Sequence, residues 1–257
     1  MNQLQNQKKS FEKAYAAGSR AHVLSKDPST QYIVSWRINE SINRLMAASE
    51  GLIGFNASIL ILCSGEGMEG SILCDRGFWD VTISDLTDNG VKAALGRDKR
   101  LKGFPLDAQN TGLANESYDI VVVQDGLHHL PSPTQGFTEM LRLAKKGVIF
   151  LEPHDSLVGR LIGTKWEKNG ESINYVFRWD KQLVEQILSS YLGRNSFVNL
   201  SFSFWHHNPV FGKLSNLLGK SLAPPVIKFI KATLDLCIGN FGNQFSGLVL
   251  KHPKKDP

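Results

Sequence analysis

The sequence predicts an α/β protein in which a mostly parallel β-sheet is covered by helices on both faces. Short, continuous apolar runs alternate with stretches of helical periodicity through the first 190 residues. A glycine-rich turn follows the first apolar run, and an aspartate ends the second. Apolar runs of this kind are typical of strands that are buried on both faces, and strands separated by helices pair in parallel.

Seven strands are expected from the apolar runs, the last of them antiparallel. They lie at residues 58–62, 80–84, 103–106, 119–123, 147–151, 196–204 and 246–250. Between the strands, apolar residues recur at helical spacing or glycines delimit short helical stretches. Helices are therefore expected at residues 32–46, 71–76, 90–96, 133–144 and 181–192.

The composition fits one large domain preceded by a smaller segment. Residues 1–50 are expected to form an N-terminal helical cap and residues 51–257 the main domain. Hydrophobic residues make up 42% of the 257 residues, but no apolar run approaches the ~20 residues that span a bilayer. The N-terminal segment has no signal-peptide core, so a cytoplasmic location is expected. Three cysteines without a CxxC pair do not form a disulfide framework, and the dispersed net charge of +5 does not favour nucleic acid as a partner.

A helical insertion is expected at about residues 206–245, between the sixth and seventh strands. Apolar residues share one helical face at 214–222 and another at 226–238, on either side of Pro224-Pro225. Packing of these helices on the domain itself is the expected arrangement. A lid, a homodimer contact, and weak contact of residues 213–238 with a membrane surface are the alternatives.

The carboxyl ends of parallel strands are where such sheets bind ligands, so the residues that follow each strand are the candidate site. Ser64, Gly65, Glu66 and Gly67 follow the first strand and precede a helix, where glycines allow the backbone to approach a ligand. Asp85 ends the second strand, 20 residues after Gly65, at a spacing that favours hydrogen bonds to ribose hydroxyls. These features fit either NAD or S-adenosylmethionine.

The motifs taken in order resemble the small-molecule branch of the class I S-adenosylmethionine-dependent methyltransferases, a group often called type 11. The resemblance covers about residues 55–155. It rests on ILILCSGEGMEG, VTISD, GFPLDAQNTGLANESYDIVVVQDGLHHLPSP and GVIFLEP. It implies a Rossmann-like fold with a seven-stranded sheet, S-adenosylmethionine as cofactor, and methyl transfer to a hydroxyl or amine of a small molecule.

The resemblance also implies a role for each cofactor-binding position. The turn of Ser64, Gly65, Glu66 and Gly67 would approach the methionine and ribose portions. Asp85 would bind the ribose hydroxyls, and Gln124 would lie close to the methionine end. The adenine would be contacted by Leu86, Asp107 and the Ala108 N–H. The chain departs from the family pattern at Cys63, where an acidic residue that orients the methionine amino group is usual, and at Glu69, where a third glycine is common.

The acceptor side is expected to contain histidines, because a histidine is a suitable base for a hydroxyl acceptor near neutral pH. His128, His129 and His154 follow the fourth and fifth strands and are the candidate catalytic bases. No HxxxH or equivalent pair lies on one helix, so a metal is not expected. The candidate substrate-binding residues follow the fifth and sixth strands: Asp155, Trp205, His206 and His207. Orientation of His154 is an alternative role for Asp155.

Three other functions remain open at this point. The GxGxxG pattern and the aspartate after the second strand also fit an NAD(P)-dependent oxidoreductase. A nucleic-acid methyltransferase is disfavoured because no Asn-Pro-Pro-Tyr-type loop and no dense basic-aromatic patch is present. Cys63, in place of the usual acid, would fit a non-catalytic S-adenosylmethionine-binding protein. The acceptor itself stays unidentified, since a sugar, a polyketide, a quinone-like ring or an amine would each fit.

Overall fold

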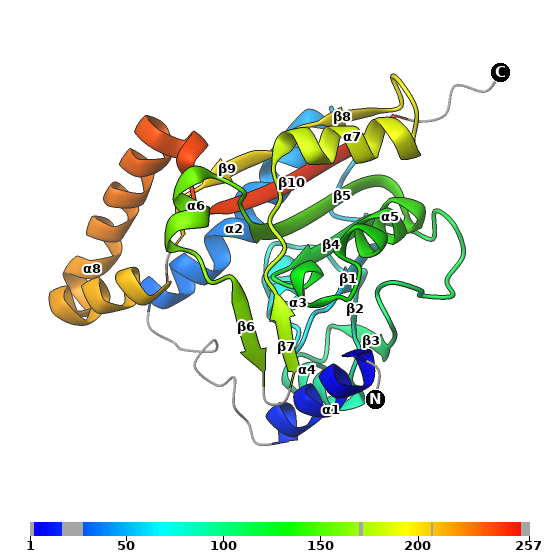
Figure 1. The fold of residues 1–257 in the computed structure, drawn as a ribbon, viewed down its shortest axis with the longest axis horizontal. Coiled ribbons are helices and arrows are strands. Elements are labelled where there is room, and N and C mark those ends of the chain that lie inside the picture. Colours follow the sequence, from blue (N-terminus) through cyan, green and yellow to red (C-terminus); the bar gives the residue numbers. More distant parts are fainter. Residues whose placement is uncertain (1–2, 17–27, 170–171, 207, 253–257) are drawn as a thin grey trace.

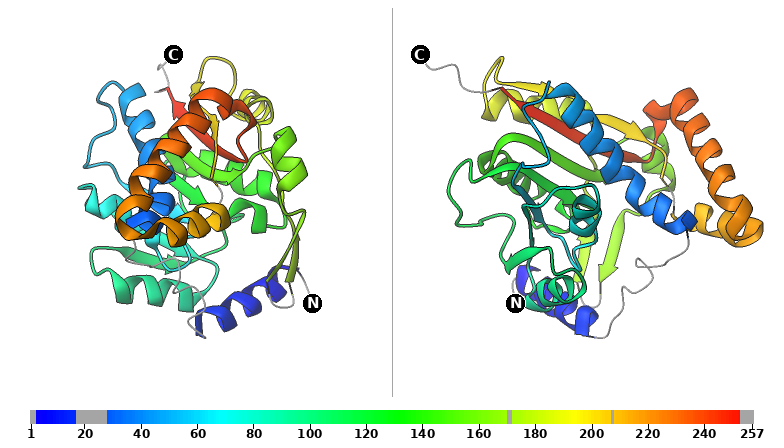
Figure 2. Two further views of the ribbon diagram at one scale, coloured as in Figure 1. Left: turned by 90° about the vertical axis from the view of Figure 1, so that its left-hand side faces the viewer. Right: turned by 180° about the vertical axis from the view of Figure 1, so that it is seen from behind.

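The computed structural model describes residues 3–16, 28–169, 172–206 and 208–252. A twisted sheet runs through the centre of the molecule with helices on both sides (Figures 1 and 2). The helical insertion stands away from the sheet at one end. The described N-terminal helix lies at the other side, near the first strands of the sheet.

The main sheet confirms the predicted mostly parallel sheet with an antiparallel last strand. The order is β3-β2-β1-β4-β5-β10-β8, with β9 also paired to β10. Strands β1 to β5 are parallel, and β10 is antiparallel to β5, β8 and β9. The strands are β1 Ile59–Leu62, β2 Val81–Asp85, β3 Lys102–Pro105, β4 Tyr118–Gln124, β5 Ala144–Pro153, β8 Phe197–Asn199, β9 Phe202–Phe204 and β10 Gln244–Lys251.

The sixth strand, expected as one segment at 196–204, is divided into β8 and β9. Ser201 lies at the division, and its hydroxyl accepts a hydrogen bond from the Leu248 N–H of β10 at 3.1 Å. The same hydroxyl donates to the Asn199 side chain at 2.5 Å. A side-chain oxygen therefore occupies a place that a backbone carbonyl would take in an uninterrupted strand pair.

Helices on the two faces of the sheet form two separate apolar clusters. Ile59 and Ile61 of β1 point to one face, and Leu60 and Leu62 point to the other, so all four are fully buried. This is why the first strand is a continuous apolar run. The helices are α2 Pro28–Ala48, α3 Met68–Asp75 and α4 Asp88–Arg97 on the first face, and α5 Pro133–Leu143 and α7 Lys181–Tyr191 on the second.

The N-terminal segment expected as a helical cap contains two helices that lie in different places. Helix α2 packs on the sheet, with Ile38, Ile42 and Leu45 fully buried in the core. Helix α1, Gln3–Ala16, instead contacts the loops that follow β2 and β4. It therefore covers part of the carboxyl edge of the sheet.

Residues 152–180 contain elements that the sequence analysis did not anticipate. A short helix, α6 Leu157–Ile162, is followed by the strands β6 Trp166–Asn169 and β7 Ser172–Tyr175, which pair with each other and not with the main sheet. Figure 1 shows this hairpin extending from the sheet towards α1. It brings a distant part of the chain to the carboxyl ends of the parallel strands.

The insertion forms α8, Asn208–Ile238, which consists of two helices joined at Gly219. Gly219 has φ 72° and ψ 173°, a backbone conformation that glycine adopts without a steric penalty. The break thus differs from the one expected at Pro224-Pro225. Pro224 and Pro225 lie inside the second helix, after its first turn.

The insertion packs on α2, as expected, through Phe211, Ala223 and Ile227. Lys231 is 1% exposed, and its ammonium lies 3.3 Å from the centre of the Trp36 ring and 2.6 Å from the Asp235 carboxylate. This lysine therefore fixes the insertion to α2. Other apolar side chains on α8 are exposed, so contact with a membrane surface or a second copy stays a prediction. Among the residues that the structure describes, no helix has the length and apolar character needed to cross a bilayer.

Candidate functional site

The glycine-rich turn and Asp85 meet directly. One Asp85 carboxylate oxygen accepts the Gly65 N–H at 3.0 Å. The other oxygen accepts the Thr87 N–H at 3.0 Å and the Thr87 hydroxyl at 2.7 Å. Gly67, with φ 69°, has no room for a side chain, because a Cβ there would lie 2.8 Å from the Ala94 Cβ. Asp85 thus joins the turn after β1 to the start of α4.

The residues predicted to contact the adenine follow the next strand in the sheet. The Leu106 N–H donates to the Asp85 carbonyl at 2.9 Å, which holds the loops after β2 and β3 together. The Asp107 carboxylate accepts the Gln109 N–H at 2.9 Å and is half-buried. Ala108 is buried and Leu86 is half-buried. The structure therefore brings the predicted ribose and adenine residues to one edge of the sheet.

Helix α1 lies over this edge. The Asp88 N–H, just after Asp85, donates to the Glu12 carboxylate at 3.2 Å. The Gln7 amide donates to the His129 carbonyl at 2.6 Å, and the Phe11 ring meets the His129 ring edge-on at 5.6 Å. The helix therefore bridges the loops after β2 and β4.

A buried carboxyl group, Glu69, lies at the start of α3. Its side chain accepts a hydrogen bond from the Gln124 amide at 2.8 Å, and both residues are less than 10% exposed. Burial raises the pKa of Glu69 to about 7. In the sequence, Glu69 stands out only as a departure from a glycine pattern. Its contact with Gln124 could not be found from spacing, since the two residues are 55 positions apart.

The raised pKa of Glu69 predicts a pH-dependent stability. The folded protein binds the Glu69 proton more tightly than the unfolded chain does, since a glutamate in the unfolded chain has a pKa of about 4.3. Proton binding by Glu69 therefore stabilises the fold fully below about pH 4.3, and this stabilisation is lost as the pH rises through about 7. Glu69→Gln keeps the oxygen that Gln124 contacts. In urea titrations without ligand, we expect this variant to exceed the wild type by on the order of 3 kcal/mol at pH 8, and by much less at pH 5.

Glu139→Gln is the matched control for this measurement. Arg142 lowers the pKa of Glu139 to about 2, so this carboxyl group remains ionised between pH 5 and 8. Its replacement should therefore change stability by the same amount at both pH values. An identical difference at pH 5 and pH 8 for Glu69→Gln would contradict the buried, proton-binding state of Glu69.

Cys63, which stands where the related family has an acid, remains an uncharged thiol. Burial raises its pKa well above the usual range, and the nearby carboxylates of Asp85, Glu152 and Asp107 raise it further. Its backbone φ of 54° places it in the left-handed region at the end of β1. A thiol held in this state cannot supply the missing negative charge.

An ion pair between Arg37 of α2 and Asp125, just after β4, lies beside these residues. The guanidinium contacts both carboxylate oxygens, at 2.6 and 3.1 Å, and Arg37 is 5% exposed. Burial raises the pKa of Asp125, but Arg37 outweighs this effect and the pKa is lowered overall, with His128 and His206 contributing. The sequence analysis missed Arg37 because it comes from the N-terminal segment.

His128 is anchored by a buried acid. Its Nδ1 lies 2.6 Å from the carboxylate of Glu152, which is fully buried and also accepts the Gly126 and Leu127 N–H groups at 2.8 and 2.7 Å. Burial lowers the pKa of His128, but Glu152 outweighs it and the pKa rises to about 10. His128 is therefore an imidazolium at neutral pH, and in this state it cannot accept a proton.

His154 is buried against the start of β10. Its Nδ1 lies 2.7 Å from the Gly242 carbonyl oxygen, and its ring stacks on Phe245 at 5.6 Å. A carbonyl only accepts, so Nδ1 carries the hydrogen and Nε2 the lone pair. Burial lowers the pKa of His154, which keeps it neutral. Asp155 forms an ion pair with Arg160 at 2.7 Å, so the Gly242 carbonyl, and not Asp155 as suggested above, orients the imidazole.

The candidate residues after the sixth strand are held by the end of the insertion. The Trp205 indole donates to the Ile238 carbonyl at 3.0 Å, and the His206 N–H donates to the Asn243 side chain at 2.9 Å. His206 is buried. His207 lies outside the described residues. Trp205 and His206 therefore belong to the packed end of the insertion, beside the loop that also holds His154.

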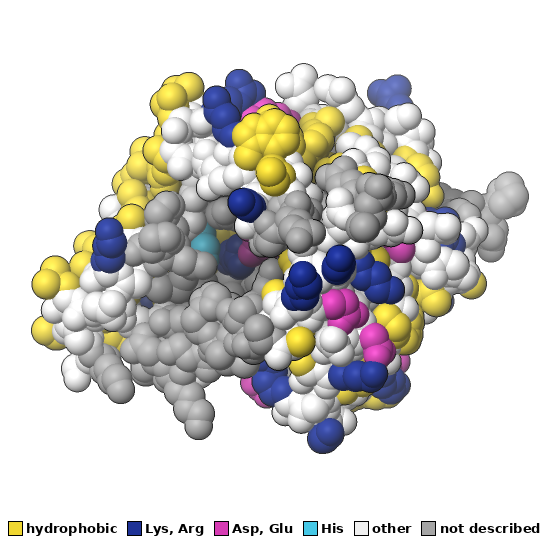
Figure 3. All heavy atoms as spheres, turned by 60° about the horizontal axis from the view of Figure 1, so that its bottom comes forward, with side chains coloured by type: hydrophobic (Ala, Val, Ile, Leu, Met, Phe, Trp, Pro, Cys, Tyr) yellow, Lys and Arg dark blue, Asp and Glu magenta, His cyan; other side chains and the backbone are white. Residues whose placement is uncertain are grey.

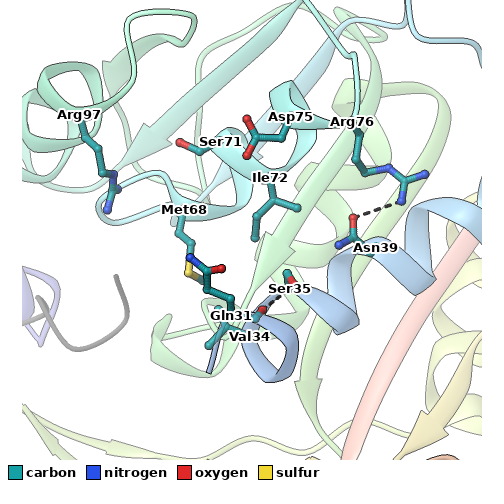
Figure 4. A pocket seen from close by; sticks show the side chains of 10 residues that line it. All are labelled: Gln31, Val34, Ser35, Asn39, Met68, Ser71, Ile72, Asp75, Arg76 and Arg97. Carbon is teal, nitrogen blue, oxygen red and sulfur yellow. Dashed lines mark hydrogen bonds between the residues drawn. The ribbon is translucent and has the colours of Figure 1, made fainter. Parts of the chain in front are cut away.

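Figure 3 brings the α1 side of the molecule forward and shows a hollow that contains histidine, basic and acidic side chains. A separate cavity of about 420 Å³ lies between α2, α3 and Arg97 (Figure 4). Met68, directly after Gly67, is one of its lining residues, so the cavity adjoins the glycine-rich turn from the helical side. The Glu66 carboxylate lies 3.7 Å from Arg97, which leaves the backbone of Glu66 for contact with a ligand in the turn.

Comparison with known proteins gives one family match and several solved structures with the same fold. Residues 60–151 match the family described as methyltransferase domain. No curated protein sequence is significantly similar to the chain. Magnesium protoporphyrin IX methyltransferase from Synechocystis PCC 6803, solved with bound S-adenosylmethionine, superposes with a TM-score of 0.58 at 13% identity over 98% of each chain.

Two further solved structures share the fold. The [4+2]-cyclase SpnF has a TM-score of 0.54 at 15% identity, covering 86% of this chain and 82% of its own. The PH0226 protein from Pyrococcus horikoshii OT3 has a TM-score of 0.51 at 18% identity, covering 86% of this chain and 93% of its own. At such identities the similarity shows the architecture alone, and the family match is confined to residues 60–151.

Proposed function

We propose that the chain, whose residues 60–151 match a methyltransferase domain, transfers a methyl group from S-adenosylmethionine to a hydroxyl or amine of a small molecule. The observation that carries the proposal is the hydrogen bond between Asp85 and Gly65. It places a carboxylate against the glycine-rich turn at the carboxyl edge of the sheet. A carboxylate has about four acceptor positions, and three are used here, so one remains for a ribose hydroxyl.

The remaining cofactor contacts follow from the same edge of the sheet. Asp107 and the Ala108 N–H would meet the adenine, with Leu86 packed on the ring. The turn of Ser64, Gly65, Glu66 and Gly67 would enclose the ribose and methionine portions. All of these positions follow β1, β2 or β3, whose carboxyl ends are adjacent in the sheet.

Glu69 and Gln124 would bind the methionine end of the cofactor. Glu69 is a buried acid with a raised pKa, and a bound ammonium group would favour its ionised form. It would thus supply the negative charge that the thiol at Cys63 cannot. Gln124, already in contact with Glu69, would donate or accept a further hydrogen bond through its amide.

Methyl transfer requires an acceptor lone pair in line with the bond between sulfur and the methyl carbon. For a hydroxyl acceptor, a base takes the proton as the oxygen–carbon bond forms. The electrons of the carbon–sulfur bond pass to sulfur and leave S-adenosylhomocysteine. His154 is the preferred base because it is neutral and its Nε2 carries the lone pair. His129 is the second candidate, while Asp155, Trp205 and His206 would contribute to the acceptor side.

Isothermal titration calorimetry with S-adenosylhomocysteine tests the cofactor assignment, with NADH as the comparison. We expect micromolar binding of S-adenosylhomocysteine and none of NADH. Binding of NADH alone would contradict the proposal and favour the oxidoreductase reading. The fold also carries other chemistry in the [4+2]-cyclase SpnF, so mass spectrometry of acceptor panels incubated with S-adenosylmethionine is the test of methyl transfer itself.

A further inference from the structure

The β6–β7 hairpin brings Glu167 to the two neighbouring histidines that follow β4. The Glu167 carboxylate lies 3.4 Å from His128 Nε2 and 3.6 Å from His129 Nδ1. One ligand atom from each of the three side chains lies within 4.8 Å of the others. Glu167 is 38 positions along the chain from His129, so no sequence spacing would have predicted this cluster.

The environment of His128 matches that of a metal ligand. Metal-binding histidines usually give their second ring nitrogen to a carboxylate or carbonyl, which fixes the orientation of the ring. Here the fully buried Glu152 holds Nδ1 at 2.6 Å, so Nε2 faces Glu167. Glu152 is itself fixed by backbone N–H groups of the same loop. Glu152 therefore fixes the ring through Nδ1, and Nε2 is directed towards Glu167.

We propose that His128 Nε2, His129 Nδ1 and the Glu167 carboxylate bind a divalent transition-metal ion. Binding releases to solvent the proton that His128 Nε2 carries in the metal-free protein, and it leaves His154 as the candidate base. Atoms that bind one ion at about 2.1 Å lie roughly 3.0–3.4 Å from one another, so the two separations that involve Glu167 need only a few tenths of an ångström of adjustment. The ligand atoms of the two histidines lie within 4.8 Å of each other, so a small rotation of the more exposed His129 ring would bring them to the same distance. Two imidazole nitrogens and one carboxylate suit zinc, cobalt, nickel, iron or manganese better than calcium or magnesium.

One feature of the cluster allows the ion to enter, and another keeps coordination positions open for other ligands. The Glu167 side chain is 39% exposed, whereas the His128 and His129 side chains are 8% and 14% exposed. The carboxylate on the hairpin is thus the open side of the cluster. Three protein ligands leave at least one position unfilled. The Asn174 amide, 3.5 Å from His129 Nδ1, would give up this contact when the nitrogen binds the ion.

The part that the metal would play in methyl transfer rests on the proposed function. The binding of the metal to the three side chains does not depend on that function. The cluster follows β4, whose last residue, Gln124, contacts Glu69 at the expected methionine end of the cofactor. An acceptor that binds the ion through one of its oxygens would therefore lie next to the methionine end of the cofactor. The expected acceptor class is therefore a small molecule with a metal-binding hydroxyl or neighbouring oxygen donors.

Titration of the full-length, metal-free protein with Co²⁺ tests the site by its absorption spectrum. Nitrogen and oxygen ligands give visible d–d bands without a near-ultraviolet charge-transfer band, whereas thiolate binding at Cys237, which is exposed, would add such a band. We expect one Co²⁺ per chain with visible bands. Glu167→Gln, on the exposed hairpin, should weaken the affinity by about tenfold or more. His252→Gln, a distant and exposed histidine, should leave it unchanged.

The outcomes separate the metal site from the cofactor site. Equal Co²⁺ affinity in the wild type and Glu167→Gln, or a thiolate spectrum alone, would overturn the proposal. S-adenosylhomocysteine titrations of Glu167→Gln should match the wild type, because Glu167 lies outside the cofactor contacts. Loss of Co²⁺ binding with intact cofactor binding supports the metal site. Failure of S-adenosylhomocysteine to bind either protein would instead disprove the proposed function and leave the metal site standing.

Discussion

Asp85→Ala is expected to weaken the binding of S-adenosylhomocysteine by about 100-fold or more in calorimetric titrations. Hydrogen bonds to a charged acceptor contribute about 1.5–3 kcal/mol each, and the variant loses both the ribose contact and the bond that holds the Gly65 N–H. The Thr87 N–H and hydroxyl lose their acceptor as well. The glycine-rich turn and the start of α4 are then no longer joined.

Asp80→Ala is the matched control for this experiment. Asp80 precedes the same strand at its amino end, where its carboxylate forms an exposed ion pair with Lys102 at 2.9 Å. Exposed pairs contribute at most about 1 kcal/mol to stability, and this one lies at the opposite edge of the sheet from the expected cofactor. Affinity should therefore be unchanged in Asp80→Ala. Equal affinities for Asp85→Ala and the wild type would remove Asp85 from the cofactor site.

Glu152→Ala is expected to lower the free energy of unfolding by about 3–5 kcal/mol. The fully buried carboxylate accepts hydrogen bonds from the Gly126 and Leu127 N–H groups and from His128. Alanine would leave these donors, and the charge on the imidazolium, without a partner in the interior. Urea denaturation followed by circular dichroism near pH 7 gives the difference.

Two further variants show whether the effect arises from the buried contact. Glu152→Gln keeps one acceptor oxygen but places an amide where the second oxygen stood, so we expect an intermediate loss. Glu185→Gln changes an exposed glutamate that contacts Asn199 at 2.8 Å, and its stability should stay within about 0.5 kcal/mol of the wild type. A loss below 1 kcal/mol for Glu152→Ala would show that the loop after β4 does not depend on this carboxylate.

Site residues on consecutive strands could be predicted from the sequence, whereas site residues that lie far apart in the chain could not. The turn at Gly65 and the acid at Asp85 belong to consecutive strands with a parallel connection, so spacing alone placed them together. Arg37, Glu69 and Glu167 had no such signal. Arg37 meets Asp125 across 88 positions, and Glu167 reaches the histidines through a hairpin that does not join the main sheet.

The sequence by itself determined the mostly parallel sheet and its antiparallel last strand, and it predicted the ends of the first three strands as the cofactor edge. A strand made of a continuous apolar run must be covered on both of its faces. Helical connections between successive runs of this kind favour parallel pairing of the strands, with helices on both faces of the sheet. These are local properties of the chain. The position of α1, the break at Gly219 and the protonation states of His128 and His154 were decided only by the tertiary structure. Each depends on which side chains, carbonyls and buried charges surround a group in space, and that environment comes from segments far apart in the chain.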